Sequence, residues 1–306
     1  MGVSPRARDI PIVDAHHHLW DLEHNYHPWL CDEPPIPFRY GDYRAIRTNY
    51  LPEDYARDGA AFDVAASVYV ETEWDPADPI GETRWIEGVA DRHGLSMAVV
   101  AQAWLERDDV EEVLAAQASF GRVRSVRHKP RAAAHPGAVE PGAAGSMGDR
   151  RWRRGYALLE RYGLAFDLQT PWWHLGEASA LARDFPSTPL ILNHTGLPAD
   201  RSDEGLAGWR KAMEILARAP NAVVKISGLG QPAAPWTVES NGPIVLDTIA
   251  IFGVDRCMFS SNFPVDSMAA DFDTIYGGFM DIVEHLPIED QHKLFSENAR
   301  RIYRPA

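Results

Sequence analysis

The chain has 306 residues, of which 45% are hydrophobic and 24% are charged. This composition is typical of a globular protein with a substantial core, and the length suits one large domain as well as two small ones. The formal net charge of −14 argues against a nucleic-acid-binding protein, because phosphates require a basic surface. The two cysteines, Cys31 and Cys257, provide neither a disulfide framework nor a cysteine-type zinc motif.

The N-terminus and the longest apolar segments bear on localisation. Residues 1–15 lack the apolar core of a signal peptide, and no apolar run is long enough to cross a bilayer. We therefore expect a cytoplasmic protein that acts on a small-molecule substrate, without a nucleic-acid or membrane partner. Whether it forms a homo-oligomer is left open by these patterns.

Eight short apolar runs recur along the chain and predict strands. They are rich in Val, Ile, Leu, Phe or Ala and are too continuous for strands with one solvated face. The runs cover residues 10–16, 63–71, 96–104, 122–128, 163–169, 189–194, 222–228 and 256–262.

Segments with helical spacing lie between these runs, and glycines follow several of them. The clearest segments are 78–94, 108–121, 149–163 and 203–218, and Gly94, Gly121 and Gly163 fall where helices should end. Strand–helix alternation of this kind predicts an α/β fold, a (β/α)8 TIM barrel formed by residues 1–306 as one domain. A doubly wound open sheet is the alternative, but no glycine-rich phosphate-binding turn follows the first strand.

Two long interruptions follow the first and fourth predicted strands. Residues 20–60 form an insertion rich in Pro, Trp and Tyr, and residues 131–147 are rich in Gly, Ala and Pro. Loops of this length are usually functional lids or mobile surface segments. Because βα loops lie on the catalytic face of a barrel, we expect both to overhang its mouth.

Three consecutive histidines end the first predicted strand, in the sequence DAHHHLW. Side chains alternate across a strand, so His16 and His18 point to one face and His17 to the other. At the carboxyl end of a barrel strand this pair would project into the mouth, with a spacing that suits one metal ion. Polar-loop or hydrogen-bonded core histidines are the alternative explanation.

Charged side chains gather where the second and fourth predicted strands end. Glu71 follows an apolar Val-Tyr-Val sequence, although a helix cap or a solvated loop carboxylate explains it equally well. The run 122–131 is the one concentrated basic stretch, and Arg127 and His128 come at its strand end. An arginine at this position would bind a carboxylate or a carbonyl that becomes an oxyanion.

The last two predicted strands also end in polar residues. Lys225 is a second candidate for anion binding, although a lysine that is salt-bridged inside the barrel explains it equally well. Asn262 follows the eighth strand, and Asp266 comes four residues later, where a helix cap is the simpler explanation. An amide has no proton-accepting carboxylate, so Asn262 can orient water or substrate but cannot act as a general base.

Five stretches together resemble the amidohydrolase superfamily, in the branch of lactone hydrolases that includes fuconolactonases and 2-pyrone-4,6-dicarboxylate lactonases. They are DAHHHLWD at the first strand, RSVRH at the fourth, LILNHTG at the sixth, MFSSNFPVD at the eighth and SENARRIYRP in the closing helix. The resemblance covers nearly the whole chain. It is fairly specific for the family and weak on substrate.

The resemblance implies that His16, His18 and His194 surround the reacting group, either through one divalent metal ion, zinc in first place, or without a metal. The family's strand 8 signature usually supplies an aspartate that takes a proton from the attacking water, and Asn262 stands at the matching position. Strand 5 ends in Gln169 instead of histidine, which weakens the case for a two-metal centre. The substrate-binding candidates are Arg127, His128, Gln169 and Lys225.

The leading hypothesis is a hydrolase that opens a lactone or similar cyclic ester of a sugar acid or an aromatic-degradation intermediate. In this hypothesis the three histidines polarise the carbonyl, Asn262 positions water or substrate, and Glu71, Asp266 or His194 activates the water. One alternative is a metal-dependent decarboxylase or other lyase on the same barrel. The other is a ligand-binding barrel whose catalytic function is altered.

Overall fold

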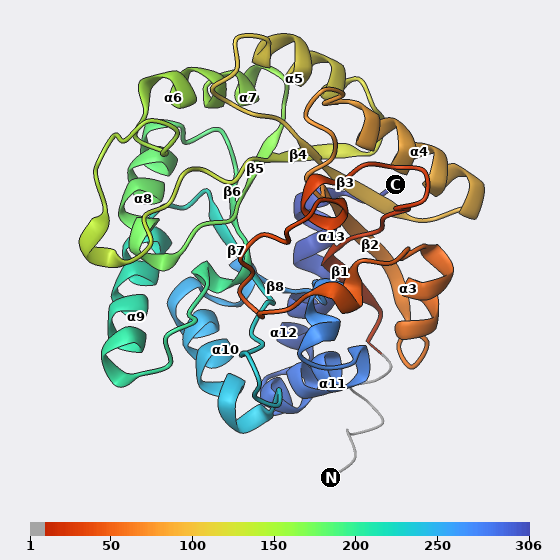
Figure 1. Cartoon of the computed structure of the whole chain (residues 1–306). Coiled ribbons are helices and arrows are strands. Elements are labelled where there is room, and N and C mark those ends of the chain that lie inside the picture. The colour runs from red at the N-terminus through yellow and green to blue at the C-terminus, as the bar shows by residue number, and fades with distance from the viewer. Residues whose placement is uncertain (1–9) are drawn as a thin grey trace.

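The computed structural model describes residues 10–306, and the predicted barrel is confirmed in that range. Eight parallel strands follow one another in sequential order, each overlapping its predicted run (Figure 1). They are β1 (Ile12–His17), β2 (Val64–Val70), β3 (Met97–Gln102), β4 (Val123–Arg127), β5 (Ala165–Leu168), β6 (Leu190–Leu192), β7 (Ala222–Ile226) and β8 (Cys257–Phe259). Their side chains are almost all buried, as a parallel sheet covered by helices requires.

The barrel closes between β1 and the segment that continues from β8. The backbone N–H of Asn262 donates to the carbonyl of His16 over 2.7 Å, and the N–H of His18 donates to the carbonyl of Phe263 over 2.7 Å. The carboxylate of Asp14 also accepts the backbone N–H of Ser261 over 2.8 Å. These bonds bring the histidine triplet beside Asn262, although the two lie at opposite ends of the sequence.

Helices surround the sheet. They are α4 (Gly81–His93), α5 (Val110–Ala118), α6 (Arg150–Tyr156), α7 (Leu158–Arg161), α8 (Leu175–Asp184), α9 (Asp203–Ala217), α10 (Val238–Phe252), α11 (Phe272–Val283), α12 (Ile288–His292) and α13 (Asn298–Tyr303). Gly94 ends α4 with a φ of 63°, as predicted. The segment predicted as one helix over 149–163 is two, and α5 ends at Ala118, so Gly121 does not cap it.

A polar cluster lies deep inside the barrel. The ammonium group of Lys225 on β7 is 2.7 Å from Oδ1 of Asp167 on β5, and both side chains are fully buried. The hydroxyl of Tyr303 on α13 donates to the same carboxylate over 2.8 Å. The backbone after α13 pairs with Met97 at the start of β3, so this helix closes the amino-terminal end of the barrel.

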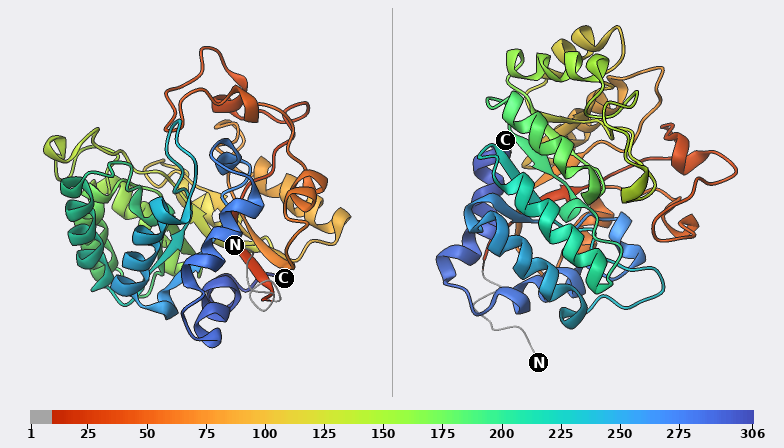
Figure 2. Two further views of the ribbon diagram at one scale, coloured as in Figure 1. Left: turned by 90° about the horizontal axis from the view of Figure 1, so that it is seen from below. Right: turned by 90° about the vertical axis from the view of Figure 1, so that its left-hand side faces the viewer.

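The insertion after β1 contains α2 (Pro28–Cys31) and α3 (Pro52–Asp58). Trp20 and Tyr50 exchange two backbone hydrogen bonds of 2.9 Å, which join the two ends of the segment between them. This segment stands over one end of the barrel, opposite the C-terminus (Figure 2). The loop 131–147 contacts the segment that follows β5, where the indole N–H of Trp173 donates to the carbonyl of Ala133 over 2.9 Å.

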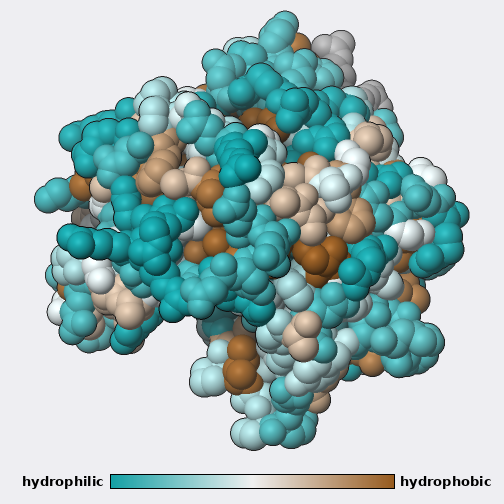
Figure 3. Space-filling model, turned by 90° about the horizontal axis from the view of Figure 1, so that it is seen from above, coloured by the Kyte–Doolittle hydropathy of each residue, from teal (hydrophilic) through white to brown (hydrophobic). Residues whose placement is uncertain are grey.

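Along residues 10–306, no helix is long and apolar enough to cross a membrane. The expectation that the chain lacks a signal peptide concerns largely residues 1–9, which lie outside the described residues. Hydrophilic residues dominate the flank of the molecule seen in Figure 3, and the apolar residues there form small separate patches.

Candidate active site

A cavity of about 380 Å³ opens at the carboxyl ends of the strands, where barrel enzymes carry their active sites. Its lining combines predicted site residues at the carboxyl ends of β1, β4, β5, β6 and β8 with apolar residues of the insertion. The lining residues are His18, Trp29, Ile36, Pro37, Phe38, Arg39, Thr72, Glu73, Arg127, Lys129, Gln169, His194, Leu197, Asn262 and Val265. The insertion therefore forms part of the cavity wall, whereas the loop 131–147 supplies none of these lining residues.

Three imidazole rings meet beside this cavity, and two of them, those of His18 and His194, line it. Nε2 of His16 lies 3.2 Å from Nε2 of His18, and the ring centroid of His194 lies 4.6 Å from that of His16. All three side chains are buried. Their assembly joins the carboxyl ends of β1 and β6, as the motifs predict.

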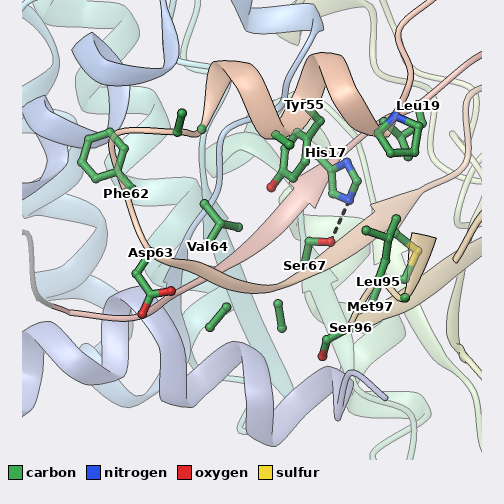
Figure 4. Close-up of a pocket in the computed structure, with 17 residues that line it drawn as sticks. His17, Leu19, Tyr55, Phe62, Asp63, Val64, Ser67, Leu95, Ser96 and Met97 are labelled. Carbon is green, nitrogen blue, oxygen red and sulfur yellow. Dashed lines mark hydrogen bonds between the residues drawn. The ribbon is translucent and has the colours of Figure 1, made fainter.

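His17 points away from the barrel interior, as strand alternation requires. Its ring stacks on Tyr55 with a centroid separation of 4.3 Å, and its Nε2 lies 3.0 Å from the hydroxyl of Ser67. Figure 4 shows this pair beside a second cavity of about 470 Å³, formed by α3, β2 and the loop before β3. None of the predicted site residues lines that outer cavity.

Hydrogen bonds on the far side of two rings determine how they face the cavity. Nδ1 of His18 donates to the carbonyl of Val70 over 2.7 Å, so its Nε2 carries the lone pair of the neutral ring. Nδ1 of His194 lies 2.9 Å from the hydroxyl of Ser227. Partners of this kind commonly orient metal-bound histidines. Burial holds the pKa of His18 and that of His194 well below the ordinary histidine value, so both rings are neutral near pH 7.

The donor atoms of His16 and His18 fit one metal ion. Two nitrogens bound tetrahedrally to zinc at about 2.0–2.1 Å are about 3.3 Å apart, close to the separation of the two Nε2 atoms. In the described part of the chain, no group of three or more His, Cys, Asp or Glu side chains is already gathered for a metal. Nδ1 of His16 is buried and finds no partner among residues 10–306. The pair therefore offers two nitrogen donors, and a metal ion bound there would need a further ligand.

Arg127 also lines the cavity, at the end of β4. Its guanidinium donates to the carboxylate and to the backbone carbonyl of Glu71, and to Oε1 of Gln169 over 3.2 Å. Arg127 and Gln169 both line the cavity, so these two substrate-binding candidates lie together. Lys129 pairs with Glu73 at the rim, where both side chains are partly exposed.

Glu71 and His128 lie behind this wall, beside a smaller cavity of about 160 Å³. One carboxylate oxygen of Glu71 accepts from Arg127, and the other accepts the backbone N–H of Glu73 over 2.8 Å. Nδ1 of His128 accepts the indole N–H of Trp152 over 3.1 Å. Neither residue lines the main cavity, which disfavours Glu71 as the base and His128 as a direct substrate ligand.

Asn262 lines the cavity, and Asp266 lies behind it. Oδ1 of Asp266 accepts from the amide nitrogen of Asn262 over 2.7 Å and from the hydroxyl of Tyr40 over 2.8 Å. Its Oδ2 accepts the backbone N–H of Gly228 over 2.9 Å. Burial raises the pKa of this carboxyl above its ordinary value. Because both oxygens are occupied and Asp266 does not line the cavity, its position disfavours the expected role as a base.

Lys225 also lies outside the cavity lining, since its ammonium group is paired with Asp167 deeper in the barrel. This position disfavours the expected role in substrate binding and agrees with the alternative of a salt-bridged barrel lysine.

Sequence reasoning missed Arg39 and Phe38, which the insertion brings into the cavity wall. The aromatic and proline content of the insertion pointed to a lid, but no motif singled out these two residues.

Comparison with known proteins agrees with this architecture. The family model described as Amidohydrolase matches residues 13–304. The uncharacterized protein y4mH of Sinorhizobium fredii is 41% identical over 296 residues, which cover 97% of this chain and 99% of that protein. The L-fucono-1,5-lactonase of Burkholderia ambifaria is 28% identical over 301 residues, which cover 95% of each chain.

A solved structure is similar over nearly the full length as well. It is that of an amidohydrolase from Burkholderia multivorans with bound zinc, which is 25% identical and superposes with a TM-score of 0.78. The match covers 97% of this chain and all of that one. The family match over almost the entire sequence, on a barrel with histidines at the ends of β1 and β6, shows that this chain belongs to the amidohydrolase family.

Proposed function

We propose that this protein is a hydrolase that opens a lactone or similar cyclic ester of a sugar acid or an aromatic-degradation intermediate. The observation that carries the proposal is the cluster of His16, His18 and His194 beside one cavity, which His18, His194 and Arg127 line. Imidazoles and a guanidinium around one cavity suit a carbonyl group that gains negative charge when water attacks it. Similarity to the L-fucono-1,5-lactonase of Burkholderia ambifaria supports the same reaction class.

His16 and His18 would hold a divalent metal ion, with His194 as the candidate for the third ligand. When bound, such an ion supplies Lewis-acid polarisation of the carbonyl and lowers the pKa of water. The zinc in the related amidohydrolase from Burkholderia multivorans supports zinc as the first choice. Gln169 at the end of β5 makes one metal ion a better fit than two.

Proton transfer from water falls to an imidazole in this scheme. Glu71 and Asp266 have both carboxylate oxygens occupied, and Asn262 has no basic group. His194 is neutral, lines the cavity and is oriented through Ser227, so it can accept a proton at Nε2 when Nδ1 carries the hydrogen. We assign it as the general base when it does not bind a metal ion. Arg127 and Gln169 would bind the carbonyl oxygen or an anionic substituent.

A panel of sugar-acid and pyrone lactones, followed with a pH indicator and with a CO₂ sensor, tests the proposal. The expected result is acid release without CO₂, lost in His194→Ala and retained in His24→Ala, whose ring is exposed. Release of CO₂ from a carboxylated aromatic substrate would instead show a lyase. Tight binding of lactones without turnover, at several metal loadings, would show a binding protein. Either of the last two results overturns the proposal.

A further inference from the structure

We propose that Asp266 is a positioning residue that turns the amide oxygen of Asn262 toward the cavity and links this orientation to docking of the insertion. The inference rests on the proposed function only in identifying the group that Asn262 would face, which is the attacking water or a substrate hydroxyl. The orientation itself follows from hydrogen bonds within the chain.

The carboxylate of Asp266 is surrounded by donors. The amide nitrogen of Asn262 lies 2.7 Å and the hydroxyl of Tyr40 lies 2.8 Å from Oδ1, and the guanidinium of Arg39 lies 3.4 Å from the same oxygen. The backbone N–H of Gly228 donates to Oδ2 over 2.9 Å. Burial raises the pKa of this carboxyl, while its four donors act in the opposite direction. All four contacts come from donors, which suits the ionised form, because it only accepts hydrogen bonds.

This arrangement determines which way the amide of Asn262 faces. Since a carboxylate cannot donate, the NH₂ group of Asn262 must point to Asp266 and the oxygen must point away from it. Asn262 lines the cavity, and its Oδ1 accepts no hydrogen bond from any of residues 10–306. It is therefore an acceptor available to a water molecule or a hydroxyl group in the cavity.

The backbone holds Asn262 in place for this role. Its N–H donates to the carbonyl of His16 over 2.7 Å, and its φ of 56° lies in the left-handed region. Asn and Asp tolerate this region better than other residues with a side chain. The position therefore accepts either an amide or a carboxylate without a change in backbone, and the side chain is what distinguishes them.

The same carboxylate also holds the insertion. Arg39 and Tyr40 belong to the insertion, and both donate to Asp266, while Arg39 also donates to the carbonyl of Gly228 over 3.4 Å. Arg39 lines the cavity as well. Displacement of the insertion would remove two of the four donors to Asp266. The position of the insertion in the cavity wall and the orientation of Asn262 therefore both depend on Asp266.

Reciprocal exchange of the two side chains tests the assignment through activity. Asn262→Asp alone would place two carboxylates 2.7 Å apart, and Asp266→Asn alone would leave the amide of Asn262 without a fixed orientation. We expect kcat to fall by at least roughly 10-fold in each, the size of a lost hydrogen bond to a charged group. The double exchange would turn the NH₂ group of the new amide at 266 toward Tyr40 and Arg39, which donate to the same oxygen of Asp266, so kcat should stay low in it as well. An unchanged kcat in Asp266→Asn would overturn the assignment.

A measurement that needs no turnover separates this inference from the proposed function. In protein labelled with ¹⁵N-asparagine, the side-chain amide signals of Asn262, identified by their loss in Asn262→Asp, should exchange slowly with solvent. Asp266→Asn should accelerate this exchange, and Asp42→Asn, which removes an exposed carboxylate of the insertion, should not. Unchanged exchange in Asp266→Asn contradicts the inference even if lactones are hydrolysed. Accelerated exchange supports it even if none is.

Tyr40→Phe tests the link between Asp266 and the insertion. It keeps Asp266 itself, so the test remains possible if the Asp266 variants do not fold. It removes one donor to Asp266 and leaves the bond between Asp266 and Asn262 in place. We expect KM to rise by roughly 5-fold to 10-fold, with kcat within about 2-fold of the unmodified protein, since one hydrogen bond at the cavity wall is lost. An unchanged KM would show that the insertion and Asp266 are not coupled.

Discussion

Nε2 of His16 lies 3.2 Å from Nε2 of His18, while the ring of His17 between them is turned outward onto Tyr55. One strand thus presents two imidazole donors to the barrel interior and uses the third to pack its outer face. The spacing fits two ligands of one metal ion. The hydrogen bond from Nδ1 of His18 to the carbonyl of Val70 fixes the orientation of the His18 ring.

Metal binding should depend on His18 and not on His17. We expect the purified protein to take up about one equivalent of zinc by mass spectrometry of metals, and His18→Ala to lose it, because a single imidazole does not complete a tetrahedral site. His17→Gln is the matched control, since it changes a neighbouring ring that faces Ser67. Equal zinc content in both variants would contradict the assignment.

Glu71→Gln should destabilise the protein through Arg127. The substitution leaves a buried guanidinium without its carboxylate, and loss of one partner of a buried pair lowers the free energy of unfolding by about 3–5 kcal/mol. Glu73→Gln breaks the partly exposed pair with Lys129 and should lower it by less than about 1 kcal/mol.

Denaturation with guanidinium chloride measures the free energy of unfolding of Glu71→Gln and of Glu73→Gln. Kinetics of the folded Glu71→Gln protein then test its role in catalysis. We expect a higher KM from misplacement of Arg127, with kcat reduced by less than in His194→Ala. A kcat loss as large as that of His194→Ala, at unchanged KM, would show that Glu71 is the base after all.

Lys225→Met should change stability and leave substrate affinity intact. The substitution leaves the carboxylate of Asp167 buried without a cation, which lowers the free energy of unfolding by about 3–5 kcal/mol. Because Lys225 does not line the cavity, KM of the folded variant should match that of the unmodified protein. Lys211→Met, an exposed change on α9, serves as the control. A rise in KM without a loss of stability would restore Lys225 as a substrate ligand.

Glu82 on α4 should make stability depend on pH. Burial, aided by the negative charge of Glu71, raises the pKa of Glu82 from 4.5 to about 7. Between pH 4.5 and about 7, Glu82 is therefore protonated in the folded state and ionised in the unfolded state. As a result, the free energy of unfolding falls as pH rises through this range.

The Glu82→Gln variant removes this titration. Denaturation gives the free energy of unfolding at pH 5 and at pH 8. We expect the difference between the two pH values to be smaller in the variant than in the unmodified protein, by up to about 3 kcal/mol. Asp91→Asn, an exposed change on the same helix, should leave that difference unaltered. An unaltered difference in Glu82→Gln as well would mean that Glu82 is ionised throughout this range.

The fold was predictable because its signals are local. Parallel strands buried on both faces require continuous apolar runs, and eight such runs separated by helical segments allow few architectures. Helix ends were less predictable. Gly94 ends α4 as expected, but α5 ends at Ala118 because backbone geometry, and not the position of Gly121, decides where the last turn closes.

Part of the site was predictable for the same reason. Strand alternation placed His16 and His18 on one face and His17 on the other, and the position of motifs at strand ends predicted that His194 and Asn262 would join them at the mouth. The sequence could not show which polar side chains are already bonded to other residues of the chain. Glu71, Asp266 and Lys225 are chemically able to act on a substrate, yet each is bonded to a partner far away in the chain or behind the cavity wall.

The sequence by itself determined the barrel, its family and the histidines at its mouth, because period, burial and motif are properties of short segments. Only the tertiary structure decided which side chains face the cavity, since that depends on contacts between segments such as Arg39 and Asp266, which are 227 residues apart. It also sharpened the role of Asn262. An amide stands where the resemblance led us to expect an acid, and the carboxylate behind it belongs to Asp266.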